Sequence, residues 1–294
     1  MTDHVSRETH LPRPAATRVF TVANQKGGVG KTTTTVNMAA ALAAGDLHIL
    51  VVDLDPQGNA STALAIDHHE GVPDIYAALV DGVAMADVVQ PVSHTPNLWC
   101  APATIDLAGA EIELVSLVAR ESRLKRTLAA YMAHHTKTHG RQLDYVFIDC
   151  PPSLGLLTIN ALVAAQEVLI PIQCEYYALE GVGQLRKTVE LIRDNLNSDL
   201  TLSTILLTMF DGRTRLSQDV ADVVRQSFGE AVLNTVIPRS VRVSEAPSYQ
   251  QTVIAYDRTS PGAVAYLQAA SELAVRLPHG EYVAAVSNEV INNG

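Results

Sequence analysis

Cysteines and long apolar runs are scarce in this chain. Its 294 residues include three cysteines, Cys100, Cys150 and Cys174, and none forms a CxxC pair. This number and spacing argue against a disulfide framework and a zinc site, so we expect reduced core residues. No run of eighteen apolar residues occurs, and the N-terminus is too polar for a signal peptide. We therefore expect a soluble, cytoplasmic protein without a membrane span.

An excess of positive charge is also lacking. The formal net charge is −10, which argues against a protein that coats nucleic acid by overall attraction. In the stretch 205–260, however, six arginines match six acidic residues, so this part is neutral while the remainder carries the acidic excess. Any contact with DNA would therefore have to use a local patch, and this stretch permits one.

A glycine-rich turn between a β-rich run and a helical run is the most informative stretch. Arg18–Val22 (RVFTV) precedes ANQKGGVGKTTTTVN, and apolar residues at helical spacing follow until Gly45 ends the helix. Backbone N–H groups of such a turn can all point inward because glycine tolerates positive φ, and the helix N-terminus adds positive partial charge. The turn therefore predicts a phosphate cradle, formed by Lys26, Gly27, Gly28, Val29, Gly30, Lys31, Thr32 and Thr33.

Within this cradle, two side chains have assigned tasks. We expect Lys31 to reach the β- and γ-phosphates of a nucleotide and the Thr32 hydroxyl to ligate Mg²⁺. The chemistry indicated is hydrolysis of the γ-phosphate. Its transition state carries negative charge spread over the phosphoryl oxygens, which must be neutralised, and the attacking water must lie in line with the leaving oxygen.

Carboxylates follow two apolar strands of the expected sheet. Asp55 comes just after HILVVDLD, at the edge where open α/β sheets bind ligands, and Asp149 ends LDYVFID. We expect Asp149 to act on a Mg²⁺-bound water, as a Walker B residue does. Asp55 is the candidate for orienting or deprotonating the attacking water, and a candidate metal ligand. For Asp53, at the strand end, positioning of the loop and a catalytic role remain equal alternatives.

Strands and helices alternate along the whole chain. This predicts one α/β domain over 18–280 with a mostly parallel, doubly wound sheet and helices on both faces. We expect a disordered tail over 1–17 and a flexible tail over 281–294. Leu107–Tyr131 is predicted to be one long helix with a basic side. The following His134, His135 and His139 are expected in an exposed polar loop rather than at a metal.

The turn departs from the plain P-loop pattern, since Gln25 stands where that pattern has glycine. KGGVGKTT, with a second lysine at Lys26, resembles the deviant Walker A motif of the ParA/MinD group of P-loop ATPases. With VVDLDPQGNAS, DCPPSLG, EYYALEG and IPRSVRVSEAPS it is similar to ParA-type chromosome and plasmid partition ATPases, including the Soj-like ones. The resemblance covers nearly all of Val19–Leu277 and implies a P-loop NTPase fold.

The resemblance also implies a cycle. ATP with Mg²⁺ would hold a homodimer in which Lys26 reaches across to the phosphates of the partner subunit, and the dimer would bind DNA without sequence preference at the nucleoid. A centromere-bound ParB-type protein would stimulate hydrolysis. Arg213 and Arg242 match arginines used on the DNA backbone, although ordinary surface ion pairs are the alternative. Met209, Ile237 and Pro238 match loops around the adenine, with core residues as the alternative.

Three other functions share parts of this pattern. A MinD-like membrane-cycling ATPase has the same loop, but it needs a basic amphipathic C-terminal helix, and no lysine or arginine follows Arg276. An iron–sulfur reductase of the nitrogenase type needs cluster cysteines in a matching motif, which this chain lacks. A nucleotide-gated DNA-binding scaffold would hydrolyse ATP only incidentally, and turnover with and without DNA and the partner separates it from an ATPase.

Overall fold

A single sheet of eight strands forms the centre of the molecule. A computed structural model of the chain describes residues 10–176 and 180–276. The strand order is β3-β4-β2-β5-β1-β6-β7-β8, and within the described residues every pair is parallel except β3 with β4. The strands are β1 (Arg18–Val22), β2 (Ile49–Asp53), β3 (Gln90–Pro91), β4 (Leu98–Ala101), β5 (Tyr145–Asp149), β6 (Glu167–Gln173), β7 (Thr201–Phe210) and β8 (Val232–Pro238). The predicted mostly parallel α/β fold is confirmed.

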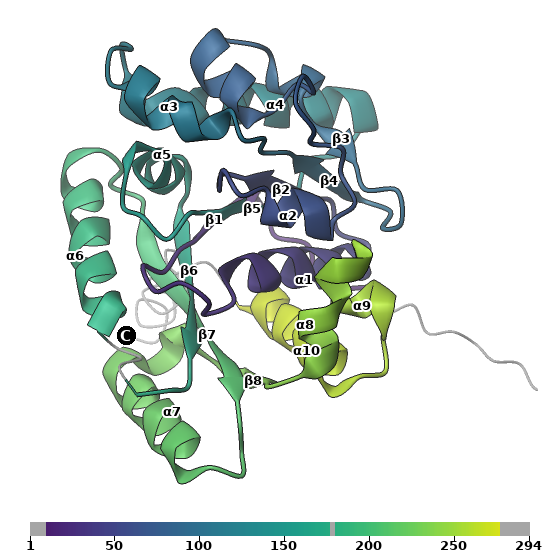
Figure 1. Ribbon diagram of the computed structural model, residues 1–294, viewed down its shortest axis with the longest axis vertical. Coiled ribbons are helices and arrows are strands. Elements are labelled where there is room, and N and C mark those ends of the chain that lie inside the picture. The colour runs from purple at the N-terminus through teal and green to yellow at the C-terminus, as the bar shows by residue number, and fades with distance from the viewer. Residues whose placement is uncertain (1–9, 177–179, 277–294) are drawn as a thin grey trace, which may run out of the picture.

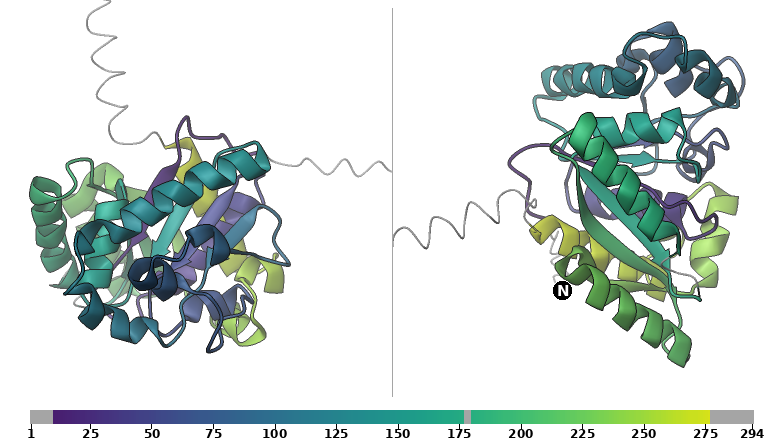
Figure 2. Two further views of the ribbon diagram at one scale, coloured as in Figure 1. Left: turned by 90° about the horizontal axis from the view of Figure 1, so that it is seen from above. Right: turned by 90° about the vertical axis from the view of Figure 1, so that its left-hand side faces the viewer.

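Helices cover both faces of the sheet, as a doubly wound fold requires (Figure 1). One face carries α3 (Leu107–Leu114), α4 (Arg123–His139), α5 (Leu156–Ala164), α6 (Glu180–Asn195) and α7 (Arg215–Phe228). The other face carries α1 (Lys31–Ala43), α2 (Asn59–Ala63), α9 (Val253–Tyr256) and α10 (Pro261–Val275), with α8 (Val241–Glu245) beside them. The right panel of Figure 2 shows α6 and α7 in front of the strands at one end of the sheet.

The register of the central strands places the two aspartates of the site side by side. β1, β2 and β5 are buried along their whole length, because the sheet has a hydrophobic core on each face. Asp53 pairs with Asp149 across β2 and β5, and Val22 pairs with Asp149 across β1 and β5. Parallel strands end at the same edge, so the turn after β1 and both carboxylates meet there.

The helix expected over Leu107–Tyr131 is two helices, so that prediction was wrong. α3 ends at Leu114, and α4 starts at Arg123 after a short 3₁₀ turn, Arg120–Ser122. Ala119 has φ +54°, a left-handed conformation that interrupts helical geometry. The break is not visible in the sequence because no glycine or proline marks it.

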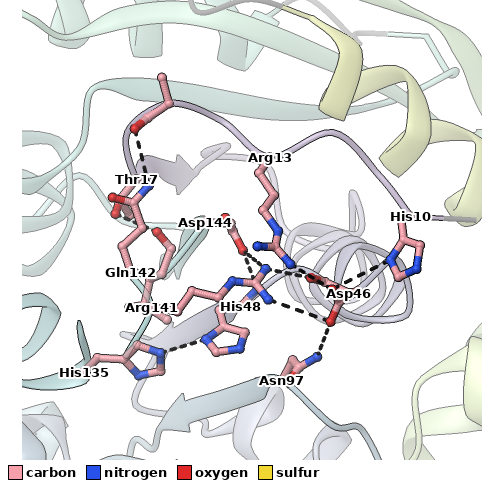
Figure 3. Close-up of polar contacts among 12 residues, drawn as sticks. His10, Arg13, Thr17, Asp46, His48, Asn97, His135, Arg141, Gln142 and Asp144 are labelled. Atoms are coloured by element: carbon pink, nitrogen blue, oxygen red, sulfur yellow. Dashed lines mark hydrogen bonds and ion pairs between the residues drawn. The ribbon is translucent and has the colours of Figure 1, made fainter. Parts of the chain in front are cut away.

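The three histidines expected in an exposed loop lie in α4, which runs to His139. His135 is completely buried, and its Nε2 lies 3.1 Å from Nδ1 of His48 (Figure 3). Burial, with the neighbouring imidazoles, lowers the pKa of His135 to about 4, so it is neutral at pH 7. In the described part of the chain no group of three or more histidines, cysteines or acids is arranged to hold a metal.

Residues 10–17 contact the domain, so the expected disordered tail is wrong for this part. The backbone N–H of Leu11 donates to the Gly45 carbonyl over 3.1 Å. Arg13 pairs with Asp46 at 2.9 Å (Figure 3). A Cβ at Gly45 would come within 2.5 Å of the Leu11 side chain. Glycine is therefore required at position 45 because Leu11 lies so close, not because the backbone has a positive φ there. The left-handed φ, 64°, is that of the next residue, Asp46. Residues 1–9 and 281–294 lie outside the described residues.

Burial agrees with the expectation for the cysteines. Cys100, Cys150 and Cys174 are all buried free thiols. Among the helices that the structure describes, none has the length and apolarity to cross a bilayer.

Candidate functional site

The turn between β1 and α1 has the geometry of a phosphate cradle. Gly28 and Gly30 have φ of 75° and 88°, values that side chains with a Cβ rarely adopt. A Cβ on Gly27 or Gly28 would meet nothing within 4 Å, so the backbone is open to a ligand at this point. α1 begins at Lys31 and directs its N-terminal N–H groups to the same space. The predicted strand, glycine turn and helix are confirmed.

Lys31 is held at the base of the turn. Its side chain is 8% exposed, and its Nζ donates to the carbonyl of Lys26 over 3.4 Å. Burial lowers the pKa of the Lys31 ammonium, while the carboxylates of Asp149 and Asp55 act in the opposite direction. A buried ammonium without an anion at contact distance gains strongly from a phosphate ligand.

Lys26 lies at the start of the turn and is half-buried. Its N–H donates to Oδ1 of Asn24 over 3.0 Å, and Nδ2 of Asn24 donates to the Pro171 carbonyl over 2.8 Å, which fixes this end of the turn to β6. Within the described ranges, the Lys26 ammonium has no hydrogen bond or ion pair.

Asp149 lies directly beneath α1 and fits a divalent cation. Oδ1 accepts from the Thr35 hydroxyl over 2.9 Å, and the nearby Thr32 hydroxyl acts to lower the pKa of this carboxyl. Oδ2 is buried and has no partner. Burial, followed by the charge of Asp53, raises the pKa of this carboxyl. A buried carboxylate oxygen without a donor is costly, and a hard cation beside the Thr32 hydroxyl would satisfy it. Asp149 and Thr32 are therefore suited to hold Mg²⁺.

Asp53 positions the loop that carries Asp55. Its Oδ2 accepts from both N–H and hydroxyl of Ser61, over 2.8 and 2.7 Å, and its Oδ1 accepts from the Asp55 N–H over 3.3 Å. The side chain is fully buried, with its carboxylate engaged in these bonds. Of the two roles left open by the sequence, the contacts support positioning. Asp55 itself is half-buried and accepts from the Gln57 N–H over 3.0 Å.

The glycine turn, Lys31 and Asp55 line one cavity of about 720 Å³. That volume lies within the range of small-molecule sites. Its lining contains Gly27, Gly28, Gly30, Lys31, Thr32 and Thr33 from the turn, together with Asp55 and Met209. Eight of the predicted site residues therefore meet at one place, although β7 and β1 are far apart in the sequence.

Four predicted nucleotide-site residues are outside the cavity lining, namely Lys26, described above, and Val29, Ile237 and Pro238. Val29 is buried, and its carbonyl accepts from the Thr208 hydroxyl over 2.8 Å, which ties the turn to β7. Ile237 is buried in the core beside α1 and α10, and Pro238 ends β8 opposite Phe210. Neither is part of the cavity lining, so their contact with an adenine stays a prediction.

The two arginines predicted to contact DNA are exposed but paired with acids. Arg213 is 89% exposed and bonds Asp211 through Nε and Nη2, both over 2.9 Å. These bonds lower the pKa of Asp211 to about 2. Arg242 lies 3.0 Å from Glu245 and 3.6 Å from Asp257. Exposed pairs of this kind contribute little and exchange readily for other anions.

The sequence did not identify part of the cavity wall. This part consists of Pro56, Gln57, Asn59, Leu107, Ala108, Glu111, Pro151, Pro152, Ser153 and Leu157. α3 was recognised as a helix, but its place beside the turn depends on tertiary packing. The proline pair of DCPPSLG was a signal for the 151–153 segment, whereas Glu111 had none.

Comparisons with known proteins agree with this geometry. A family model described as AAA domain matches residues 17–202. The sporulation initiation inhibitor protein Soj of Bacillus subtilis is 50% identical over 257 residues, which is 87% of this chain and 98% of that protein. The chromosome partitioning protein ParA of Myxococcus xanthus is 47% identical over 259 residues, covering 88% of each chain.

A solved structure has the same fold. It is described as cobyrinic acid a,c-diamide synthase from Mycobacterium smegmatis with bound ADP and magnesium. Its TM-score is 0.74 at 39% sequence identity, and the match covers 88% of this chain and 94% of that one.

Proposed function

The chain belongs to the Soj/ParA family of chromosome-partitioning ATPases, and from this premise we propose that it binds ATP with Mg²⁺, pairs with a second copy around the nucleotide and hydrolyses it on DNA. The observation that carries the proposal is the convergence of the glycine turn, Lys31, Thr32 and Asp55 on one cavity, with Asp149 beneath it. Their ligand would be a nucleoside triphosphate.

Each residue then has a defined task. The N–H groups of the turn and Lys31 bind and orient the phosphates and neutralise charge that spreads over the γ-phosphoryl oxygens. Thr32 and, indirectly, Asp149 would hold Mg²⁺, which would add positive charge at these oxygens when bound. Asp55, held in place through Asp53, accepts a hydrogen bond from the attacking water and orients it toward phosphorus. Asp53 remains a positioning residue.

The second lysine couples turnover to pairing. Lys26 of the partner subunit would reach the phosphates held by this chain, a charge supplied in trans as an activating arginine is for GTPases. ATP would then stabilise the dimer, and hydrolysis would loosen it by mass action. The half-buried Lys26, fixed at its backbone and without an ion pair in the described parts of the chain, supports such a role.

DNA and a ParB-type protein complete the proposal. The dimer would bind the DNA backbone without sequence preference through exposed arginines such as Arg213 and Arg242. A centromere-bound ParB-type partner would stimulate hydrolysis, and the protein would work in the cytoplasm on the nucleoid. Support comes from the family and from the exposure of these arginines beside acids that can exchange for phosphate.

Replacing Arg213 and Arg242 together by glutamate should weaken DNA binding in the ATP state at least about tenfold at low salt. The slope of log affinity against log salt should fall by about two, because each phosphate contact contributes about one unit. Arg186→Glu with Arg193→Glu on α6 serves as a control of equal charge change. Filter retention of random duplex DNA at several salt concentrations measures both the affinity and its dependence on salt. Undiminished binding by the first variant would remove the patch from the proposal.

Steady-state turnover tests the proposed function as a whole. We expect slow basal ATP hydrolysis, stimulated jointly by DNA and a ParB-type partner from the same genome, and an ATP-dependent dimer in sedimentation. The name of the Mycobacterium smegmatis structure describes a different ATP-dependent reaction, so one arm adds a corrinoid acid with an ammonia donor. Turnover that depended on the corrinoid and ignored DNA would contradict the proposal.

A further inference from the structure

Met209 has a backbone conformation that is unusual for its position. It lies inside β7, between β6 and β8 (Figure 1), yet its φ is +51°, in the left-handed region that a bulky residue rarely adopts. Within the described residues, the other five non-glycine residues with a positive φ lie in turns. Met209 alone among the six lines the nucleotide cavity. Strained conformations of this kind cluster at active sites and switch regions.

The residue before Met209 is tied to the phosphate cradle. The Thr208 hydroxyl donates to the Val29 carbonyl over 2.8 Å, and both residues are buried. A Cβ on Gly30 would lie 3.9 Å from the Thr208 methyl group, so the strand and the turn pack directly together. The Thr208 carbonyl also accepts from the Cys174 N–H over 3.2 Å, just after β6. A shift of the turn on nucleotide binding would therefore reach Thr208.

The chain after Met209 leads directly to Arg213, one of the two arginines that we propose to contact DNA. Asp211 accepts two bonds of 2.9 Å from the Arg213 guanidinium and one of 3.1 Å from the Arg213 N–H. The Thr214 hydroxyl donates to the Asp211 carbonyl over 3.0 Å. The loop 211–214 is therefore held together by its own bonds and follows the end of β7.

The end of β7 also holds the segment that carries Arg242, the second of these arginines. The Phe210 carbonyl accepts from the Arg239 N–H over 3.1 Å, and Phe210 pairs with Pro238 at the end of β8. α8 begins two residues after Arg239 and carries Arg242 in its first turn. The pairing of β7 with β8 is irregular between Leu207 and Phe210, where Met209 lies. Both arginines are thus connected to the residues that follow Met209.

We propose that Met209 is a hinge through which the nucleotide cavity controls the positions of Arg213 and Arg242. This inference rests on the proposed function and concerns the regulation of its DNA surface. A left-handed and an extended backbone at Met209 would direct Phe210 and Asp211 differently, as a hinge residue does. A nucleotide that binds one of the two conformations better shifts their balance, and the two arginines move with the end of β7.

Two substitutions at Met209 separate its backbone from its side chain. Met209→Gly adopts φ +51° without strain and should hold the left-handed conformation. Met209→Ala loses the same side chain but keeps a Cβ, and with it the strain. The quantity measured is the ratio of the affinity for duplex DNA with a slowly hydrolysed ATP analogue to that without nucleotide. We expect this ratio to fall at least about fivefold in Met209→Gly and to stay unchanged in Met209→Ala.

Thr208→Val tests the link to the cradle without a change at Met209. It removes the hydroxyl that donates to Val29 and nearly keeps the shape of the side chain, so the ratio should fall here too. Ala119→Gly is the matched control, because Ala119 has φ +54° in a turn outside the cavity lining. By linkage, DNA should change the affinity for the ATP analogue by the same factor as the analogue changes the affinity for DNA.

A reduced ratio in Met209→Gly and Thr208→Val, with ATP-dependent dimers retained in sedimentation, supports the inference. An unchanged ratio in Met209→Gly overturns it, and so does an equal fall in Met209→Ala, which would assign the coupling to the side chain. Loss of the dimer together with the ratio would assign the effect to pairing and also overturn it. A ratio of one in an unaltered chain that hydrolyses ATP on DNA would refute the hinge alone, whereas an unaltered chain that bound no DNA in either state would contradict the proposed function.

Discussion

Lys26→Ala should retain ATP binding but lose ATP-dependent dimerisation, and its stimulated turnover should fall by a factor of about 10³ to 10⁵. The cavity keeps Lys31 and the glycine turn, which bind phosphates within one chain. The Lys26 side chain is not part of that lining. Its removal therefore takes away only the charge that one subunit would supply to the other. The N–H of residue 26 still donates to Asn24, so the turn keeps its anchor.

The measurements are nucleotide affinity, sedimentation with ATP and turnover with DNA and the ParB-type partner. Lys125→Ala is the matched control, because Lys125 is an exposed lysine on α4 away from the cavity lining. It should behave as the unaltered chain. A Lys26→Ala protein that still formed an ATP-dependent dimer would refute the role in trans.

Asp55→Ala should differ from Lys26→Ala in keeping the ATP-dependent dimer. Its turnover should nevertheless fall by a factor of about 10² to 10⁴. The carboxylate would orient the attacking water, whereas Lys26 and Lys31 hold the phosphates. Asp55→Asn is the sharper variant, since its amide oxygen still accepts from the Gln57 N–H and preserves the loop. Both should hydrolyse ATP slowly if the carboxylate acts on water.

Single-turnover hydrolysis and sedimentation separate the two steps for Asp55. Asp81→Ala, an exposed aspartate outside the cavity lining, controls for the loss of a charge. Normal hydrolysis by Asp55→Asn would show that the water is oriented by another group. Loss of the dimer together with turnover would place Asp55 in nucleotide binding instead.

Prediction from the sequence succeeded where the signal was local. The alternation of strands and helices, the glycine turn and the acids after two strands are each contained in short stretches, and all lie where they were expected. The errors concern segments whose conformation depends on distant partners. Residues 10–17 are ordered by Gly45 and Asp46, and His135 is buried against His48, contacts that no local pattern reveals.

The sequence by itself determined the phosphate cradle, because glycines with positive φ, a lysine and the first turn of a helix specify that geometry within a few residues. It also determined which carboxylates reach the same edge, since parallel strands end together. The tertiary structure alone decided that Asp53 holds the Asp55 loop through Ser61 and that α3 forms a cavity wall with an exposed apolar outer side. Those facts depend on contacts between segments far apart in the chain, and no short pattern encodes which surfaces packing leaves uncovered.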